Sequence, residues 1–134
     1  MNAEADAVSA TRSFPANRHS VTAARRLASH MLGDSPNEVR EAVELMISEL
    51  TTNCVRHGKA SFELTISIDH AEKQIRVEVS DPGGGTPTMR SPGPDEPTGR
   101  GLRIVDMLSD EWGVRPKSPA GKTVWFRLEV SRGG

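Results

Sequence analysis

Two polar side chains interrupt the apolar pattern of a helix, and a third interrupts the pattern of a strand. Glu49 and Asn53 stand one helical turn apart in the stretch ISELTTNCVRHG, along one border of an apolar stripe. Asp81 continues the alternation of Ile75, Val77 and Val79, which places it on the inward face at the end of a strand. A carboxylate directed toward a core needs hydrogen-bond donors, so we expect Asp81 to meet them there.

Each of these residues also has an ordinary structural explanation. A helix border is a common place for polar side chains, and Asn53 could simply bond to a neighbouring carbonyl. The sequence DPGG, which begins at Asp81, is also typical turn chemistry.

Two glycine-rich motifs follow and favour a binding site. DPGGG, residues 81–85, lets the backbone come close to a ligand without interference from a Cβ atom. GRGL, residues 99–102, opens a helix whose first free amides can bind an anion. Each motif is weak alone, but with the acid they predict a pocket that has a carboxylate at one end and a phosphate site at the other.

The elements that must position these residues begin with two helices. Apolar residues recur at helical spacing from Ser20, which we expect to cap the first helix, to a break at Gly33. For the second helix we expect Ser35 as the cap and Pro36 at the first helical position. Its apolar stripe predicts that it runs to about His57.

Alternating strands make up much of the remaining pattern. SFELTISID, residues 61–69, and QIRVEVSD, residues 74–81, alternate apolar and polar side chains, which predicts a hairpin covered on one face only. A short strand near 112–115 and a last strand over 124–130 close the chain. Residues 82–98 are dense in Gly and Pro and predict a long loop.

This order of elements favours an α+β fold, a two-layer sandwich with a mostly antiparallel sheet and helices on one face. The length of 134 residues fits one domain, which we expect over 13–134. Residues 1–12 lack periodicity and predict a disordered tail, while SFP around Phe14 could add a short edge strand.

Composition excludes several classes of function. The net charge is -1 and the basic residues are scattered, which argues against a direct nucleic-acid partner. The single Cys54 cannot form an internal disulfide, and no Cys/His cluster has the spacing of zinc ligands. The N-terminus does not read as a secretory signal, and no apolar run is long enough to span a membrane. We therefore expect a cytoplasmic protein.

Four segments in order resemble the motifs of the histidine-kinase-like (GHKL) ATPases. SELTTNCVRHG resembles their N box, VSDPGGG their Asp-x-Gly-x-Gly box, GRGLRIV their Gly-x-Gly-Leu box and GKTVWFRL their last strand. The resemblance covers roughly 20–130 and is greatest to the bacterial anti-sigma-factor serine/threonine kinases. It implies a Bergerat-type ATP-binding fold.

The resemblance also implies roles for the polar residues and the glycines. Asp81 would accept a hydrogen bond from the exocyclic amine of adenine, Asn53 would coordinate Mg²⁺, and Glu49 would be the catalytic general base. Lys122 stands where many members have a Thr that contacts adenine through water. The loop over 82–98 would be the ATP lid. The further ATP contacts implied are Gly83, Gly85, Gly99, Arg100, Gly101, Leu102 and Val124.

By this resemblance the chain would be an ATP- and Mg²⁺-dependent kinase that phosphorylates a serine or threonine on a small anti-anti-sigma-like antagonist and holds a sigma factor. A homodimer is also expected, through a sheet edge or the side of the first helix. The alternative from another class is a non-catalytic ATP-binding module that recruits a partner when nucleotide orders the lid. The presence of Glu49 favours the enzyme.

Overall fold

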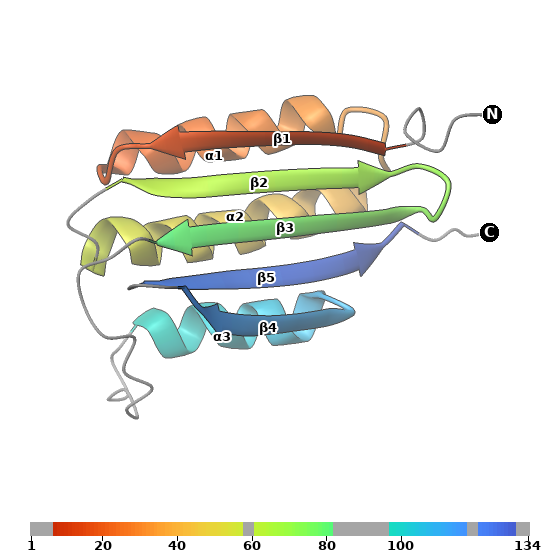
Figure 1. Ribbon diagram of the computed structural model, residues 1–134. Helices are drawn as coiled ribbons and strands as arrows, with labels where there is room; N and C mark the ends of the chain where they lie inside the picture. Colours follow the sequence, from red (N-terminus) through yellow and green to blue (C-terminus); the bar gives the residue numbers. More distant parts are fainter. Residues whose placement is uncertain (1–6, 58–60, 82–96, 118–120, 131–134) are drawn as a thin grey trace.

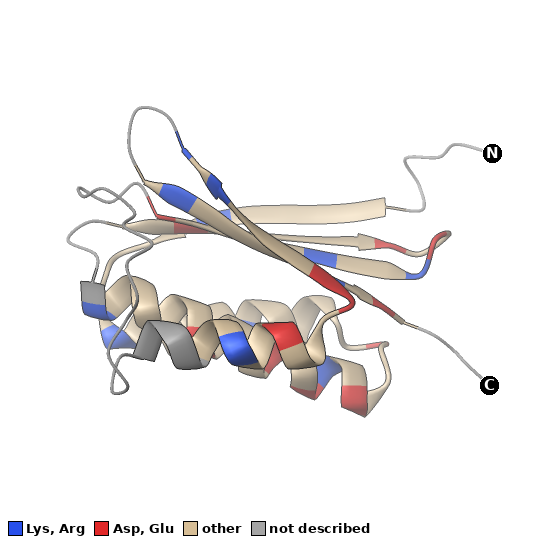
Figure 2. Cartoon of the chain, turned by 90° about the horizontal axis from the view of Figure 1, so that it is seen from below, with Lys and Arg blue, Asp and Glu red and all other residues tan. Residues whose placement is uncertain are grey.

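The chain folds into two layers, a five-stranded antiparallel sheet with helices on one face (Figure 1). The structure is a computed structural model that describes residues 7–57, 61–81, 97–117 and 121–130. Figure 2 shows the helices together on one side of the sheet, with the other face open. The strand order is β1-β2-β3-β5-β4. The elements are β1 Ala7–Phe14, α1 Arg18–Met31, α2 Asn37–His57, β2 Phe62–Asp69, β3 Gln74–Asp81, α3 Pro97–Leu108, β4 Glu111–Pro116 and β5 Lys122–Glu129.

The predicted α+β sandwich and its hairpin are confirmed. β2 and β3 pair antiparallel, with Leu64 opposite Val79, so that their apolar residues share the buried face. The turn between them is closed by Asp69, whose Oδ1 accepts a hydrogen bond from the backbone N–H of Glu72 at 3.0 Å. Lys73 then takes a left-handed conformation with φ 55° and leads into β3.

The predicted tail is wrong where the structure describes it. β1 begins at Ala7, inside the segment 1–12, and pairs with β2 along its whole length up to Phe14. Residues 1–6 lie outside the described residues. The short edge strand expected around Phe14 is thus the end of a longer strand.

Few apolar side chains mark β1 as a strand, which is why its sequence pattern is weak. Phe14 is its only buried residue, and its ring stacks on Phe62 with centroids 5.6 Å apart. On the open face Thr11 shares a hydrogen bond with Thr65, with 2.9 Å between their hydroxyl oxygens. Cross-strand hydroxyl pairs and backbone pairing hold this edge strand in place, and neither produces a hydrophobic period.

The first helix begins earlier than predicted. Asn17, not Ser20, is the N-cap of α1, and its side-chain oxygen accepts a hydrogen bond from the N–H of Ser20 at 3.2 Å. The hydroxyl of Ser20 is directed backwards and donates to the carbonyl of Pro15 at 2.6 Å. Asn and Ser are both good caps, so the choice between them depends on the path of the chain from β1.

The limits of the other helices are close to those predicted. α2 begins at Asn37, because the carbonyl of Pro36 already accepts the first helical hydrogen bond, and it ends at His57 as expected. α3 begins at Pro97, so the predicted loop over 82–98 ends earlier than expected. Most of that loop, including Gly83 and Gly85, lies outside the described residues.

The core fills the space between the helices and the sheet. It is built on fully buried side chains of the central strands and of α2, and these fix which side of α2 faces the sheet. The largest of them are Phe62, Leu64, Ile66, Ile75, Val77, Phe126, Val43, Met46 and Ile47. Within the described residues, none of the helices is long and apolar enough to cross a bilayer.

Candidate functional site

Glu49 and Asn53 lie at the border of the buried face of α2, as the sequence predicts. Met46 and Ile47 are fully buried on the preceding turn and Leu50 is nearly so, whereas Glu49 and Asn53 are half-buried. The core therefore holds the helix in one rotation, and this rotation directs the acid and the amide toward the neighbouring helix α3.

Gly101 of α3 lies directly against this turn of α2. A Cβ atom at Gly101 would be 3.0 Å from Nδ2 of Asn53 and 3.5 Å from Cβ of Glu49. The first of these distances is shorter than an ordinary van der Waals contact, so no larger residue fits without movement. The close approach of the two helices therefore favours glycine here, and it brings the GRGL motif beside Glu49 and Asn53.

Asp81 lies at the end of β3, next to Cys54 and Lys122. Asp81 and Lys122 are opposite each other in the pairing of β3 with β5. The pKa of the Cys54 thiol is raised to about 12, mainly by burial and also by the negative charge of Asp81, while the positive charge of Lys122 lowers it. Both charged groups therefore lie near this buried thiol, and Cys54 directly follows Asn53 in the chain.

The three polar residues singled out from the sequence, Glu49, Asn53 and Asp81, thus all lie at or near one turn of α2. Glu49 and Asn53 face Gly101, and the next residue after Asn53 is close to Asp81. A ligand bridging these points would meet a carboxylate at the end of β3 and the amide of Asn53 farther along. Asp81 and the GRGL motif therefore lie near opposite ends of this turn of α2. That they line a nucleotide pocket stays a prediction.

The raised pKa of Cys54 predicts a loss of stability in alkali. In the unfolded chain the thiol ionises near its ordinary pKa of 9.0, whereas in the folded protein it stays protonated to about 12. Stability that is present below pH 9 is therefore lost as the pH rises above it, because the unfolded state releases its proton first. We expect the free energy of unfolding of the wild type, measured relative to Cys54→Ala, to fall by about 1 kcal/mol between about pH 8 and about pH 10.

Urea unfolding of both proteins at the two pH values provides this measurement, and the Ala variant corrects for all other titrating groups. An unchanged difference between the two proteins would show that the thiol is in contact with water.

The face of the sheet on which Lys122 lies was not predicted from the sequence. Gly121, with φ 98°, begins the last motif, and a left-handed conformation of this kind suits glycine. Lys122 follows on the helix side of the sheet, half-buried. Thr123 has its hydroxyl on the opposite side, where it shares a hydrogen bond of 2.8 Å with the hydroxyl of Ser80. Thr123 therefore does not supply the threonine hydroxyl that the family motif would place next to Asp81.

The alternation of β5 was the signal that could have placed Lys122. Counting back by two from Val124, which is buried opposite Val79, puts Lys122 on the same face. Val124 itself is part of the core, and Leu102 packs partly buried against it. The backbones of Gly99 and Arg100 lie in the first turn of α3. Their predicted nucleotide contacts stay predictions.

The donor atoms at the site suit a hard cation and a phosphate ligand better than a transition metal. Among the residues that the structure describes, no group of three or more His, Cys, Asp or Glu could hold a metal ion. Gly101 lies against the amide nitrogen of Asn53 and against Cβ and the carbonyl oxygen of Glu49, so the side chains beside it are one amide and one carboxylic acid. Mg²⁺ is commonly bound by one or two protein oxygens, with phosphates and waters as its other ligands.

Comparison with known proteins identifies a family for the chain and structures with the same fold. The family profile described as "Histidine kinase-like ATPase domain" matches residues 14–128. A search of curated proteins found no match.

Several solved structures share the fold, and two of them are the following. The RsbU and RsbW domains of Rv1364c from Mycobacterium tuberculosis match with a TM-score of 0.73 and 17% identity, over 95% of this chain and 34% of that one. The histidine kinase domain of the blue-light activated histidine kinase EL346 from Erythrobacter litoralis matches with a TM-score of 0.56 and 23% identity, over 82% of this chain and 59% of that one. The chain therefore spans about a third of the first neighbour and somewhat over half of the second.

Proposed function

Because the chain belongs to the histidine kinase-like ATPase domain family, we propose that it is an ATP- and Mg²⁺-dependent protein kinase that modifies a serine or threonine of a small antagonist protein and so regulates a sigma factor. The observation that carries the proposal is the contact of Gly101 with the turn that bears Glu49 and Asn53. It places an acid beside the helix whose N-terminus would hold the phosphates.

Each residue of the site has one role in this proposal. Asp81 accepts a hydrogen bond from the adenine amine, and Asn53 holds Mg²⁺ through its amide oxygen. The metal neutralises charge on the triphosphate when it is bound. Glu49 is the group within this turn that can accept a proton.

Glu49 acts on the hydroxyl of the partner protein. The hydroxyl oxygen forms a bond to the γ-phosphorus of ATP while the bond from that phosphorus to the β–γ bridging oxygen breaks. The hydroxyl proton passes to the Glu49 carboxylate, and ADP carries away the electron pair of the broken bond. α2 positions the acid, since the buried turn before it fixes the rotation of the helix.

A single-turnover assay tests the proposal. The protein is mixed with ATP labelled on the γ-phosphate and with proteins captured from the native cell, and label on a serine or threonine of a small partner is the expected result. Label that stays in ATP while the partner still binds only with nucleotide would favour the non-catalytic binding module. A labelled histidine on the partner would overturn the proposed serine/threonine specificity.

The proposed partners are an anti-anti-sigma-like antagonist and a sigma factor, both cytoplasmic proteins, so the protein would act in the cytoplasm. A homodimer belongs to the same proposal. β4 is an edge strand of the sheet that a second copy could pair with, and proteins commonly block or pair such edges. Light scattering over a range of protein concentrations tests the dimer, and a monomer mass throughout would contradict it.

The contact at Gly101 leads to a prediction for the substitution Gly101→Ala. The added methyl group would meet Nδ2 of Asn53 at 3.0 Å and must displace either the amide or α3. Overpacking of this kind costs roughly 1 to 3 kcal/mol. We expect the affinity for Mg-ATP to fall roughly tenfold, measured by calorimetry.

The matched control is Gly33→Ala, in the turn after α1, where the nearest atom to an added Cβ is 3.6 Å away. This variant should bind Mg-ATP like the wild type. Equal affinities for Gly101→Ala and the wild type would mean that the Asn53 amide does not touch the ligand.

A further inference from the structure

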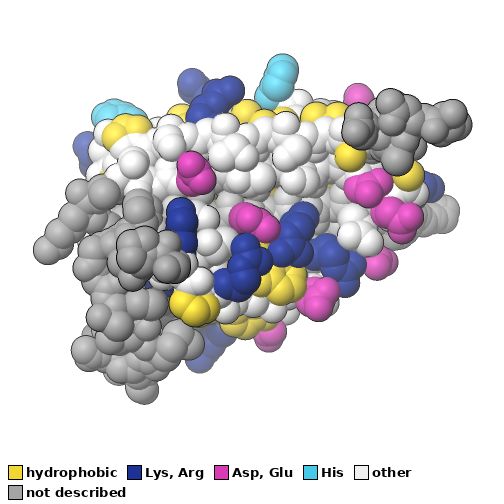
Figure 3. Space-filling view, in the orientation of Figure 1, with side chains coloured by type: hydrophobic (Ala, Val, Ile, Leu, Met, Phe, Trp, Pro, Cys, Tyr) yellow, Lys and Arg dark blue, Asp and Glu magenta, His cyan; other side chains and the backbone are white. Residues whose placement is uncertain are grey.

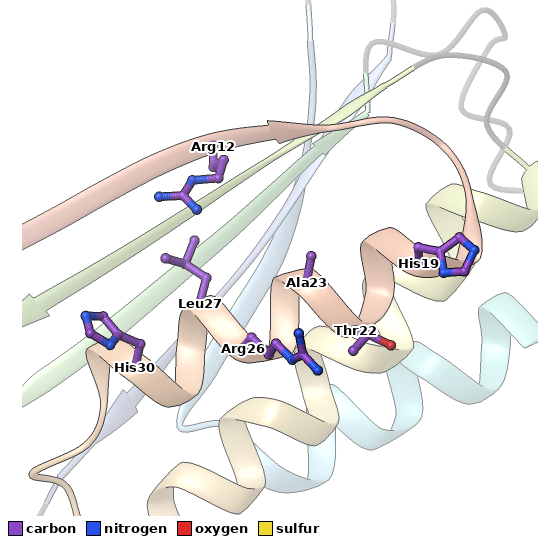
Figure 4. A pocket seen from close by; sticks show the side chains of 7 residues that line it. All are labelled: Arg12, His19, Thr22, Ala23, Arg26, Leu27 and His30. Carbon is purple, nitrogen blue, oxygen red and sulfur yellow. The ribbon is translucent and has the colours of Figure 1, made fainter.

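A shallow groove separates the edge strand β1 from helix α1 (Figure 4). Its volume is about 630 Å³. Arg12 lines it from the strand, His19, Arg26 and His30 line it from the helix, and Leu27 contributes an apolar surface between them. We call this feature the edge groove. It is formed by β1 and α1, whereas Glu49, Asn53 and Asp81 belong to α2 and β3.

Arg12 faces the helix layer although it belongs to a strand of the sheet. It is opposite Leu64, whose side chain is fully buried between the layers, and residues opposite each other in an antiparallel pair share a face. Arg12 itself is exposed, because β1 lies at the edge of the sheet. Its guanidinium therefore stands over the outer flank of α1.

The backbone of β1 is available on its outer side. β1 is the first strand in the order β1-β2-β3-β5-β4, so among the described residues it pairs on one side only. A further strand added there would be continuous with the sheet and would lie along the edge groove. Every second side chain of that strand would point toward the helix layer.

The charge of the edge groove indicates what kind of strand could be added there. α1 has the sequence RHSVTAARRLASHM and β1 has AVSATRSF, and neither contains an acidic residue. Figure 3 shows basic and histidine side chains along the edge of the molecule where these two elements lie. The whole chain has a net charge of -1, so this concentration of positive charge is local. It fits a negatively charged ligand.

We propose that the edge groove binds an extended acidic segment of a partner protein, added to β1 as a further strand. Side chains on one face of a strand repeat about every 7 Å, and Arg26 and His30, one turn apart on α1, are separated by about 6 Å along the helix. Acidic residues at alternate positions of the segment therefore match these two side chains. Arg12 extends from β1 on the side that faces α1.

A second copy of this chain fits the groove poorly. Its own β1 carries Arg12 and no acidic residue, so a second β1 offers no negative charge to Arg12, Arg26 or His30. The proposal names the surface that would bind a partner protein. It rests on the proposed function only in requiring that such a partner exists. It requires neither nucleotide nor phosphate transfer.

The test uses the full chain and a dye-labelled peptide of about ten residues that alternates Glu with Thr, long enough to pair with β1. Fluorescence anisotropy at low salt should show saturable binding at a protein concentration below about 1 mM. The same peptide with Lys in place of Glu should not bind. A Glu peptide with N-methyl groups at alternate backbone amides, which cannot pair as a strand, should not bind either.

Variants of the protein locate the site. Arg12→Glu combined with Arg26→Glu should weaken binding of the acidic peptide at least about tenfold, because like charges then face each other. Arg25→Glu reverses a single charge on the same helix outside the groove, and its effect should stay within about twofold. Both substituted positions in the double variant are exposed, so the fold should persist, and circular dichroism checks it.

Three results would overturn the proposal. The first is that the Glu peptide shows no saturable binding. The second is that Arg25→Glu and the double variant lose peptide affinity equally. The third is that the peptide displaces a homodimer, which would mean that a second copy occupies β1. Calorimetry of Mg-ATP binding by the same variants is a separate readout. If only the groove proposal is wrong, the variants still bind Mg-ATP with wild-type affinity. If the proposed function is wrong, the wild type itself does not bind Mg-ATP.

Discussion

Glu49→Ala should bind Mg-ATP with an affinity within about twofold of wild type and transfer phosphate roughly 10² to 10⁴ times more slowly. A general base accepts its proton during the transfer, so its removal raises the energy of the transition state and leaves the bound ground state nearly unchanged. Glu49 is half-buried at the border of α2, outside the fully buried core. The fold should therefore tolerate the truncation.

The measurement pairs calorimetry of Mg-ATP binding with single-turnover transfer to a captured partner. Glu41→Ala is the matched control, because it removes an exposed carboxylate from the same helix, away from the site, and should transfer phosphate at the wild-type rate. Glu49→Gln keeps the shape of the side chain and removes its basicity, so it should be as slow as the Ala variant. Transfer by Glu49→Ala at the wild-type rate would eliminate this residue as the base.

Asp81→Asn should lower the affinity for Mg-ATP by about 5- to 150-fold. In the proposed site the carboxylate accepts a hydrogen bond from the adenine amine, whereas an asparagine amide directed the same way would offer a donor to a donor. A mismatch of this kind in a buried site costs roughly 1 to 3 kcal/mol. The position at the end of β3, beside Cys54 and opposite Lys122, supports a site that is partly removed from water.

Two further measurements make the Asp81 result specific. Asp34→Asn makes the same change in the exposed turn after α1 and should leave the affinity unchanged. The titration of Cys54 should respond in Asp81→Asn, because the negative charge of Asp81 contributes to the raised pKa of that thiol. Its pKa should fall in a correctly folded variant. Wild-type affinity for ATP in Asp81→Asn would contradict adenine recognition by this acid.

The parts of the fold that the sequence predicted well are those with one face in the core. β3 alternates Ile75, Val77 and Val79 with polar residues, and the strand begins and ends at the predicted residues 74 and 81. β1 lacks this signal, since Phe14 is its only buried residue, and it was predicted as a tail over most of its length. A strand held by backbone pairing at a sheet edge has little reason to show a hydrophobic period.

The candidate site was predicted in part for the same reason. Helical and strand periods placed Glu49, Asn53 and Asp81 at the borders of the core, and the structure describes them there. The contact between Gly101 and Asn53 depends on how closely α3 packs on α2, and no local spacing encodes a distance between two helices. The side of the sheet taken by Lys122 was available from the alternation of β5.

The most direct test of the account is a calorimetric titration of ATP into the wild-type chain, first with Mg²⁺ and then with the metal removed by a chelator. In the proposed site, Asn53 beside Gly101 would hold the metal-bound triphosphate and Asp81 beside Cys54 would recognise adenine. We predict saturable binding of about one ATP per chain with Mg²⁺, weakened at least about tenfold by the chelator. Absence of binding in the presence of Mg²⁺, with the protein shown to be folded, would contradict the account.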